Sequence, residues 1–331
     1  MERTIVIAEA GVNHNGDMET AKKMVDVAKE CGADYVKFQT ADIDSLVIDN
    51  APISSYQKNN IGLECSQKEM IGKILLPIEK FKELSEYCKI RDIGFLSTPF
   101  DIKSVYYLDK QVNIWKVPSG EITNTPYLIE IARTHKDVIL STGMSSLKEV
   151  EYAFRLLKNS GTNNIILLHC TTQYPAPLED VNLNAMNTLK EHFNVKVGYS
   201  DHTKGFEISL AAVAMGASII EKHFTLDKNM SGPDHKASLE PNELKQMIKA
   251  IRNINIAMGS GIKKLTESEK ENLFIARKSI VAEKRIKKGE ILTENNISIK
   301  RPGNGISPTR WFEILGKVAI RDFEKDEMIE I

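Results

Sequence analysis

Three features typical of membrane, nucleic-acid-binding or disulfide-rich proteins are absent from this sequence. No apolar run approaches the roughly 20 residues that a membrane helix needs. Lysine and arginine number 44 against 45 aspartates and glutamates, so the net charge is -1 and no overall field would attract nucleic acid or an anionic membrane. We therefore expect neither partner, and any bound anion must be held by a local cluster of cations.

Cysteine is scarce, and its four copies have no spacing that would build a disulfide framework or a metal finger: Cys31, Cys65, Cys88 and Cys170. We expect reduced thiols, as in a cytoplasmic protein. The first residues lead directly into an apolar segment and lack the pattern of a signal peptide, which favours the same compartment.

The sequence does contain eight short apolar runs that each end in polar or charged residues. Helical segments separate them: after the first run, Ala21, Met24, Val25 and Ala28 fall on one helix face, and Gly32 ends the helix. This alternation predicts a parallel sheet with right-handed crossovers, and eight repeats in roughly 250 residues predict an α/β fold, the (β/α)8 or TIM barrel. The expected strands are Ile5–Gly11, Tyr35–Thr40, Gly94–Phe100, Ile114–Gly120, Val138–Met144, Ile165–Thr171, Lys196–His202 and Ser218–Thr225.

The pattern changes after Gly259, where short alternating segments punctuated by glycine and proline replace the strand–helix repeat. This change predicts a barrel over residues 1–260, a linker over 261–275 and a small β-rich domain over 276–331. A domain of roughly 55 residues buries little core of its own, so we expect it to pack on another surface.

One connection is unusually long, because residues 41–76 are polar and irregular before the helix expected at Ile78–Ile90. The segment follows a strand, so it should hang over the end of the barrel where TIM-barrel active sites lie. Long loops within compact domains are usually functional. We interpret this one as a lid or substrate loop, with a plain surface insertion as the alternative.

Two histidines, His202 and His223, end the seventh and eighth runs, which are neighbours in a barrel. Imidazoles from adjacent strand ends can share a divalent metal, with water and substrate oxygens at the open positions. The alternative is that each ring hydrogen-bonds within the barrel mouth. His14, His169 and His235 are further candidate ligands without an equally clear position.

Lys37 and Lys116 lie late in strands that are otherwise apolar, where an ammonium group needs an anionic partner. We expect them to bind a phosphate or carboxylate, although a salt bridge to Glu9 or Glu121 would also explain either lysine. Four hydroxyl groups at strand ends could complete the anion site: Thr98, Ser119, Ser141 and Ser200.

A covalent role is a further alternative for these lysines, because a desolvated lysine can form a Schiff base with a carbonyl substrate. Lys222 also qualifies by its position near a strand end. Neighbouring strand residues face opposite sides, however, so Lys222 should point toward the helices if His223 points inward.

Three further charged residues are candidates for binding the substrate. Glu9 ends the first run and could bind substrate hydroxyls or act as a base, or serve as a counter-ion to a lysine. Asp234 follows the eighth strand and could bind sugar hydroxyls, or be a turn residue. Arg301 lies in a stiff Pro-Gly loop that suits directional bonding to an amide or carboxylate, or is a solvated surface charge.

Nine motifs follow one another across both expected domains: AEAGVNHNG (Ala8–Gly16), VKFQT (Val36–Thr40), LSTPFD (Leu96–Asp101), KVPSGE (Lys116–Glu121), LSTGM (Leu140–Met144), HCTTQYP (His169–Pro175), GYSDHT (Gly198–Thr203), EKHFTLD (Glu221–Asp227) and KRPGNGI (Lys300–Ile306). Together they make the chain resemble the sialic acid synthase family, whose members make N-acetylneuraminate, legionaminate and pseudaminate. The C-terminal part is similar to that family's antifreeze-like (SAF) domain. The GPDHKAS stretch (Gly232–Ser238) argues against the pseudaminate branch.

The resemblance implies a role for each candidate residue. A divalent ion, most often Mn²⁺ with Mg²⁺ or Co²⁺ as alternatives, would lie on His202 and His223. Phosphoenolpyruvate would lie against Lys37, Thr98, Lys116, Ser119, Ser141, Thr172 and Ser200. An N-acetylated amino sugar would be held by Glu9, Gln39, Tyr174 and Asp234, and by Arg301 from the small domain of a partner subunit in a domain-swapped homodimer.

The resulting hypothesis is a transferase that condenses phosphoenolpyruvate with an N-acetylmannosamine-type sugar. The product would be the nine-carbon N-acetylneuraminate plus phosphate, formed on a metal-activated aldehyde with C–O cleavage. The same chemistry on 2,4-diacetamido-2,4,6-trideoxymannose, giving N,N'-diacetyllegionaminate, is the alternative, and the sequence favours the first sugar only narrowly. A Schiff-base aldolase using pyruvate and a non-catalytic carbohydrate-binding protein are the rival hypotheses.

Overall fold

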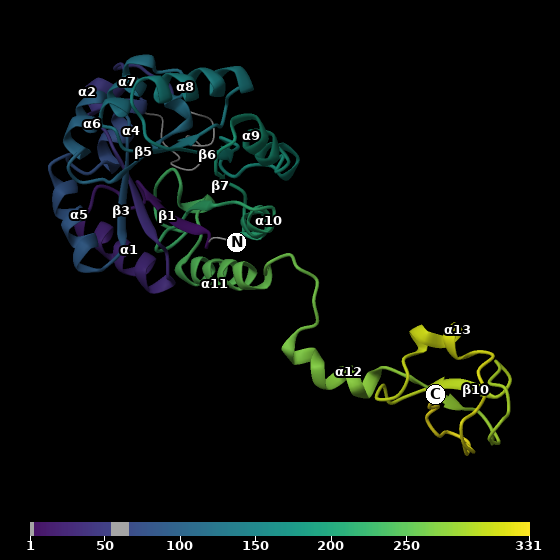
Figure 1. Cartoon of the computed structure of the whole chain (residues 1–331). Coiled ribbons are helices and arrows are strands. Elements are labelled where there is room, and N and C mark those ends of the chain that lie inside the picture. The colour runs from purple at the N-terminus through teal and green to yellow at the C-terminus, as the bar shows by residue number, and fades with distance from the viewer. Residues whose placement is uncertain (1–2, 54–65) are drawn as a thin grey trace. The chain divides into compact units, whose positions relative to one another are not determined.

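The computed structural model describes residues 3–53 and 66–331. The chain divides into two compact units, Met1–Ser260 and Gly261–Ile331 (Figure 1). The first unit contains eight parallel strands in the order β3-β2-β1-β8-β7-β6-β5-β4, and β3 and β4 are also in contact, so the strands surround a common axis. They are β1 (Ile5–Gly11), β2 (Tyr35–Thr40), β3 (Gly94–Pro99), β4 (Ile114–Val117), β5 (Asp137–Ser141), β6 (Ile165–Cys170), β7 (Val197–Asp201) and β8 (Ile219–His223). The predicted TIM barrel is confirmed.

Helices connect the strands and cover the outside of the barrel (Figure 1). The first helix shows why the sequence folds this way: the side chain of Asp17 accepts a hydrogen bond from the Thr20 amide, and Gly32 ends the helix at a φ of 89°. The helices of this unit are α1 (Met18–Cys31), α2 (Ile43–Leu46), α4 (Gln67–Ile74), α5 (Lys80–Ile90), α6 (Ile102–Leu108), α7 (Thr125–Arg133), α8 (Leu147–Asn159), α9 (Ala185–Phe193), α10 (Glu207–Ala214) and α11 (Pro241–Ala257).

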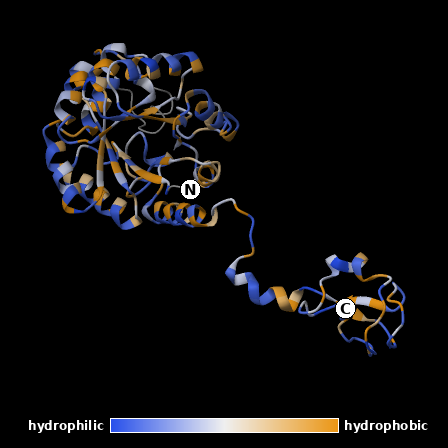
Figure 2. Cartoon of the chain, viewed as in Figure 1, coloured by the Kyte–Doolittle hydropathy of each residue, from blue (hydrophilic) through white to orange (hydrophobic). Residues whose placement is uncertain are grey.

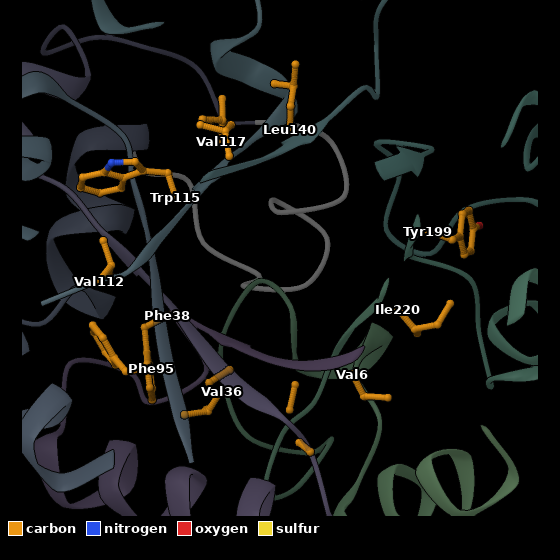
Figure 3. Close-up of a cluster of buried hydrophobic side chains, with 14 of the residues drawn as sticks. Val6, Val36, Phe38, Phe95, Val112, Trp115, Val117, Leu140, Tyr199 and Ile220 are labelled. Carbon is orange, nitrogen blue, oxygen red and sulfur yellow. The ribbon is translucent and has the colours of Figure 1, made fainter. Parts of the chain in front are cut away.

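Side-chain alternation along the strands creates two apolar layers. In β1, Val6 and Ala8 pack toward the helices, whereas Ile7 belongs to a separate cluster inside the barrel. Figure 3 shows part of the outer layer, with Phe38 and Trp115 among its large side chains. In Figure 2 the surrounding helices carry both apolar and polar residues, as expected when only one face of each is buried.

The long connection after β2 is more regular than the sequence predicted. Two short helices, α2 and α4, lie in the segment 41–76, which we expected to be irregular, and residues 54–65 of it lie outside the described residues. The helix α4 begins with a capping box in which Ser66 and Glu69 each bond the other's backbone amide. This local signal is carried by polar residues, which is why the segment resembled a loop.

The C-terminal unit forms its own apolar cluster around an antiparallel pair, β9 (Ser279–Ala282) and β10 (Ile297–Lys300). Ile280, Leu292 and Phe323 are buried in this cluster. The unit also contains α12 (Lys270–Ala276), which overlaps the predicted linker, and α13 (Trp311–Ile314). In neither unit does a described helix have the length and apolar character required to cross a bilayer.

We predict that Leu84→Ala in α5 lowers the free energy of unfolding by about 2–5 kcal/mol, because Leu84 is fully buried and its removal leaves a cavity. Ile90→Ala in the same helix is the matched control, since Ile90 is 78% exposed and should change stability by less than about 0.5 kcal/mol. Denaturant unfolding of the two variants measures the difference. Equal effects of the two substitutions would contradict the burial of this helix face.

Candidate active site

A cavity of about 340 Å³ opens at the carboxyl ends of the barrel strands. Every predicted site residue of the barrel unit lines it: Glu9, Lys37, Gln39, Thr98, Lys116, Ser119, Ser141, Thr172, Tyr174, Ser200, His202, His223 and Asp234. Arg301 lies in the C-terminal unit, where its Nε donates a hydrogen bond to the carbonyl of Ala276. The barrel thus gathers these side chains from segments that are far apart in the sequence.

Strand register explains why the charged groups meet. Glu9 of β1 lies opposite Lys37 of β2 on one side and His223 of β8 on the other. Residues two apart on a strand face the same side, so Glu221 and His223 both line the cavity. The same holds for Lys37 and Gln39. Four strand positions are enough to place carboxylate, ammonium and imidazole groups in contact.

Lys37 lies between two carboxylates. Its Nζ is 2.9 Å from Glu9 Oε2 and 3.7 Å from Glu221 Oε2, and it donates a 2.9 Å hydrogen bond to Thr98. Burial disfavours the charge, but Glu221 and Glu9 raise the pKa of Lys37 above its usual value. The contact with Glu9 is the salt bridge that the sequence left open as an alternative.

Glu221 is a site residue that the sequence analysis missed. Its carboxylate lies 3.3 Å from Lys116 Nζ and accepts a 2.9 Å hydrogen bond from Ser200, in addition to its contact with Lys37. Burial opposes ionisation, but Lys116 and Lys37 lower the pKa of Glu221 to about 2. The available signal was its spacing of two residues from His223, which places both side chains on one face.

The partner of Lys116 is therefore Glu221, and not the Glu121 considered from the sequence. Burial lowers the pKa of Lys116, while the attraction of Glu221 opposes the shift. Lys116 is 3% exposed, so this ammonium group has little contact with solvent. An anion entering the cavity would meet a cation whose hydration has already been removed.

The hydroxyl groups near Lys116 are brought together by a glycine. Ser119 accepts a 2.9 Å hydrogen bond from the Gly143 amide and lies 3.3 Å from the Cys170 sulfur. A Cβ at position 143 would lie 2.3 Å from Thr172 Oγ1 and 3.0 Å from Ser119 Oγ, so only glycine leaves room for this arrangement. Ser141 adds a buried hydroxyl that has no hydrogen-bond partner within the described part of the chain.

The two imidazoles are in the neutral protonation state, which a metal requires of a histidine ligand. Nδ1 of His202 bonds the Thr171 carbonyl at 2.7 Å, which assigns the ring proton to Nδ1 and leaves the lone pair on Nε2. Burial lowers the pKa of His202 to about 4 and that of His223 well below its usual value, so both rings are neutral. Their centroids are 5.6 Å apart, and the buried Nδ1 of His223 has no hydrogen-bond partner among the described residues.

These two rings could hold a divalent ion that keeps open positions for substrate and water. Residues 3–53 and 66–331 contain no group of three or more His, Cys, Asp and Glu side chains arranged to bind a metal, so the protein would supply two ligands. The other candidate histidines bond elsewhere: His169 contacts the Val181 carbonyl and His235 contacts Thr225. His14 is buried and stacks at an angle on Phe38.

Asp234 lines the cavity from the connection between β8 and α11. Burial, with a smaller contribution from Glu9, raises the pKa of Asp234 to about 7. Ser238 donates a 2.7 Å hydrogen bond to the Asp234 carbonyl, and Asn13 donates to Ser238 at 3.0 Å. These bonds hold the backbone at Asp234 in place, and its carboxyl group can carry a proton near pH 7.

Lys222 lies on the other face of β8. Its Nζ donates to the Thr203 carbonyl at 2.6 Å and pairs with Asp201 at 3.1 Å, and neither Lys222 nor Asp201 lines the cavity. Ser209 also donates to Asp201. This fully buried pair joins the barrel to its helices, which agrees with the orientation expected from strand alternation.

Comparison with known proteins identifies the family of this chain. The NeuB family matches residues 24–263, and the SAF domain matches residues 277–330. The chain belongs to the NeuB family. It is therefore an enzyme of the synthase type, and its small C-terminal unit is a SAF domain.

Three relatives of this NeuB-family chain are informative. The N,N'-diacetyllegionaminic acid synthase of Campylobacter jejuni is 54% identical over 99% of both chains. The enzyme of the same name from Legionella pneumophila is 45% identical, covering 94% of this chain and 89% of that protein. A crystal structure of an N-acetylneuraminic acid synthetase from Leptospira borgpetersenii has a TM-score of 0.72 at 35% identity, covering 82% of this chain and 90% of that one.

We predict that Glu221→Gln destabilises this NeuB-family barrel by about 3–5 kcal/mol at pH 7, because it leaves two buried ammonium groups with less compensating charge. The folded-state pKa of about 2 lies below the ordinary 4.5, so the carboxylate stabilises the fold above pH 4.5. That contribution is lost as the pH falls toward 2. The gap in melting temperature between wild type and variant should narrow over this range.

The exposed Glu86 on α5 supplies the control, since Glu86→Gln should leave the melting temperature close to that of wild type at every pH. If the difference in melting temperature between wild type and Glu221→Gln stays constant from pH 7 to pH 3, Glu221 does not stabilise the fold through its charge.

Proposed function

We propose that this chain joins phosphoenolpyruvate to an N-acetylated mannosamine-type sugar, with release of phosphate and formation of a nine-carbon keto acid. One observation carries the proposal: two buried lysines, two neutral imidazoles and three carboxyl groups line a single cavity. The ammonium groups suit an anionic substrate, the imidazoles suit a divalent metal, and the carboxyl groups suit a polyhydroxylated sugar.

The sugar we favour is 2,4-diacetamido-2,4,6-trideoxymannose, which makes the product N,N'-diacetyllegionaminate. Relatives with 54% and 45% identity are named for that product, whereas the structurally similar N-acetylneuraminic acid synthetase is 35% identical. This reverses the narrow preference drawn from the sequence, which placed N-acetylmannosamine first. N-acetylneuraminate synthesis is the second candidate function.

Phosphoenolpyruvate would bind where the cations and hydroxyls meet. Lys37 and Lys116 supply positive charge, and the hydroxyls of Thr98, Ser119 and Ser141 lie around them on the same cavity lining. Thr172 and Ser200 complete the group of hydroxyl residues. Because these groups are already desolvated and fixed by the barrel, they would position the phosphate and carboxylate at little further cost.

In the proposed reaction, C3 of phosphoenolpyruvate forms a bond to the aldehyde carbon of the open-chain sugar, and the aldehyde oxygen takes up a proton. Asp234, with its pKa of about 7, can donate that proton. Water then adds at C2, with Glu9 placed to accept its proton, and the C2–O bond to phosphate breaks to leave the ketone. A divalent ion on His202 and His223, which we propose is Mn²⁺ with Mg²⁺ or Co²⁺ as alternatives, would supply Lewis-acid polarisation.

We predict that phosphate release requires both a sugar and a divalent metal. Wild-type protein, measured with 2,4-diacetamido-2,4,6-trideoxymannose and with N-acetylmannosamine, should release phosphate in the presence of manganese and should stop when chelator is added. His202→Ala should lower the rate by at least about 100-fold, because Lewis-acid stabilisation of the transition state is worth several kcal/mol. Circular dichroism checks that the variant stays folded.

The same experiment separates the rival functions. A Schiff-base aldolase would keep its activity in chelator and would be trapped covalently by borohydride with pyruvate. A carbohydrate-binding protein would release no phosphate with either sugar. Phosphate release that is sugar-dependent but insensitive to chelator would contradict the proposed metal site without contradicting the proposed condensation.

We also propose that Arg301 completes the site of a partner subunit in a swapped homodimer, on the basis of the resemblance to the sialic acid synthase family. We predict that Arg301→Ala and His202→Ala are each inactive alone. When the two proteins are unfolded together and refolded, about a quarter of the wild-type activity should return, because half of the dimers have one intact site.

A mixture of the two variants that regains no activity, although mixed dimers form, would show that Arg301 acts on its own barrel or on neither. Lys300→Ala is the matched control. Lys300 neighbours Arg301 but pairs with Glu283 and Asp326 of its own domain, so this variant should retain activity.

A further inference from the structure

The cavity has two chemically different sides. Its charged and hydroxyl groups come from the strand ends and the loops that follow them, whereas α2, α4 and the residues that follow them contribute mainly carbon surface. We call the second side the apolar wall, and it consists of Leu46, Val47, Met70, Ile71, Ile74 and Leu75. Met70 is buried and the other five are partly exposed, which leaves apolar surface facing the cavity.

Specific contacts hold the apolar wall together and pack it against the loop after β1. Lys68 of α4 pairs with Asp44 at 2.9 Å and with Asp49 at 2.7 Å, which joins α4 to the α2 region. At the far end of α4, a Cβ at Gly16 would lie 3.2 Å from the Lys73 carbonyl oxygen, so the loop after β1 packs closely against the helix. These contacts hold the apolar wall in position as part of the cavity lining.

We propose that the apolar wall selects acceptor sugars in which C6 is a methyl group and not a hydroxymethyl group. This inference rests on the proposed function. The reacting aldehyde at C1 must lie among the charged groups, so the opposite end of the sugar points toward the remaining side of the cavity. Phosphoenolpyruvate carries two anionic groups and cannot be the molecule that this carbon surface recognises.

The apolar wall provides few hydrogen-bond partners for a C6 hydroxyl group. Among the lining residues that α2 and α4 contribute, Gln67 is the single polar side chain. A hydroxyl placed against Ile71 and Ile74 would lose its water without gaining a partner, whereas a methyl group there would be removed favourably from water. The specificity would therefore come from desolvation rather than from a hydrogen bond.

The test compares N-acetylmannosamine with its 6-deoxy derivative, which differ only at C6. Wild-type protein with manganese should show a kcat/KM at least about tenfold higher for the 6-deoxy sugar, the range expected for one group in an apolar pocket. Ile71→Asn and Ile74→Asn should reduce that ratio toward one, mainly by lowering kcat/KM for the 6-deoxy sugar. Ile48→Asn is the matched control: Ile48 is 80% exposed in the same segment and does not line the cavity, so the ratio should not change.

Each outcome bears on a different statement. No phosphate release from any sugar would overturn the proposed function. Release from both sugars with equal kcat/KM in wild type would overturn this inference alone, as would an unchanged ratio in folded Ile71→Asn and Ile74→Asn variants. If the asparagine variants lose their thermal transition, Ile71→Ala supplies the same comparison, because shortening the side chain also removes carbon surface from the wall.

Discussion

A cluster of four buried charges determines how this active site can work. Glu9, Lys37, Glu221 and Lys116 alternate in sign across β1, β2, β8 and β4, and each is at most 4% exposed. Isolated charges would be far too costly in such a place, but alternating charges with hydrogen bonds stabilise one another. The carboxylates favour the charged form of each lysine: the pKa of Lys37 lies above its usual value, whereas that of Lys116 stays below it because burial prevails. An anionic substrate can compete with the carboxylates for both groups.

Burial explains the neutral histidines. It is the largest effect on His202 and His223 and outweighs the opposing attraction of Glu221, so their pKa values fall and their rings remain unprotonated. Neutral imidazoles repel neither the neighbouring lysines nor a divalent ion. One desolvated cavity therefore holds two kinds of binding group, lysine side chains that suit anions and neutral imidazoles that suit a metal.

The sequence was sufficient for the strands and for most of the cavity lining. Apolar runs that end in a polar residue are costly unless those ends share a site, and the barrel brings all the ends together. Glu221 was not predicted, although it lies two positions before His223 on the same strand and therefore faces the same way. The helix α4 was overlooked because its capping signal is polar and resembles a loop, and α2 because it has only four residues and no side-chain cap.

The sequence by itself determined the barrel, the SAF domain and the chemical types available at the strand ends, because these follow from local periodicity and ordered motifs. Only the tertiary structure decided which carboxylate pairs with which lysine, and that a wall of carbon surface borders the charged groups. Pairing and desolvation depend on distances between residues far apart along the chain. Such distances exist only once the strands have closed around their common axis.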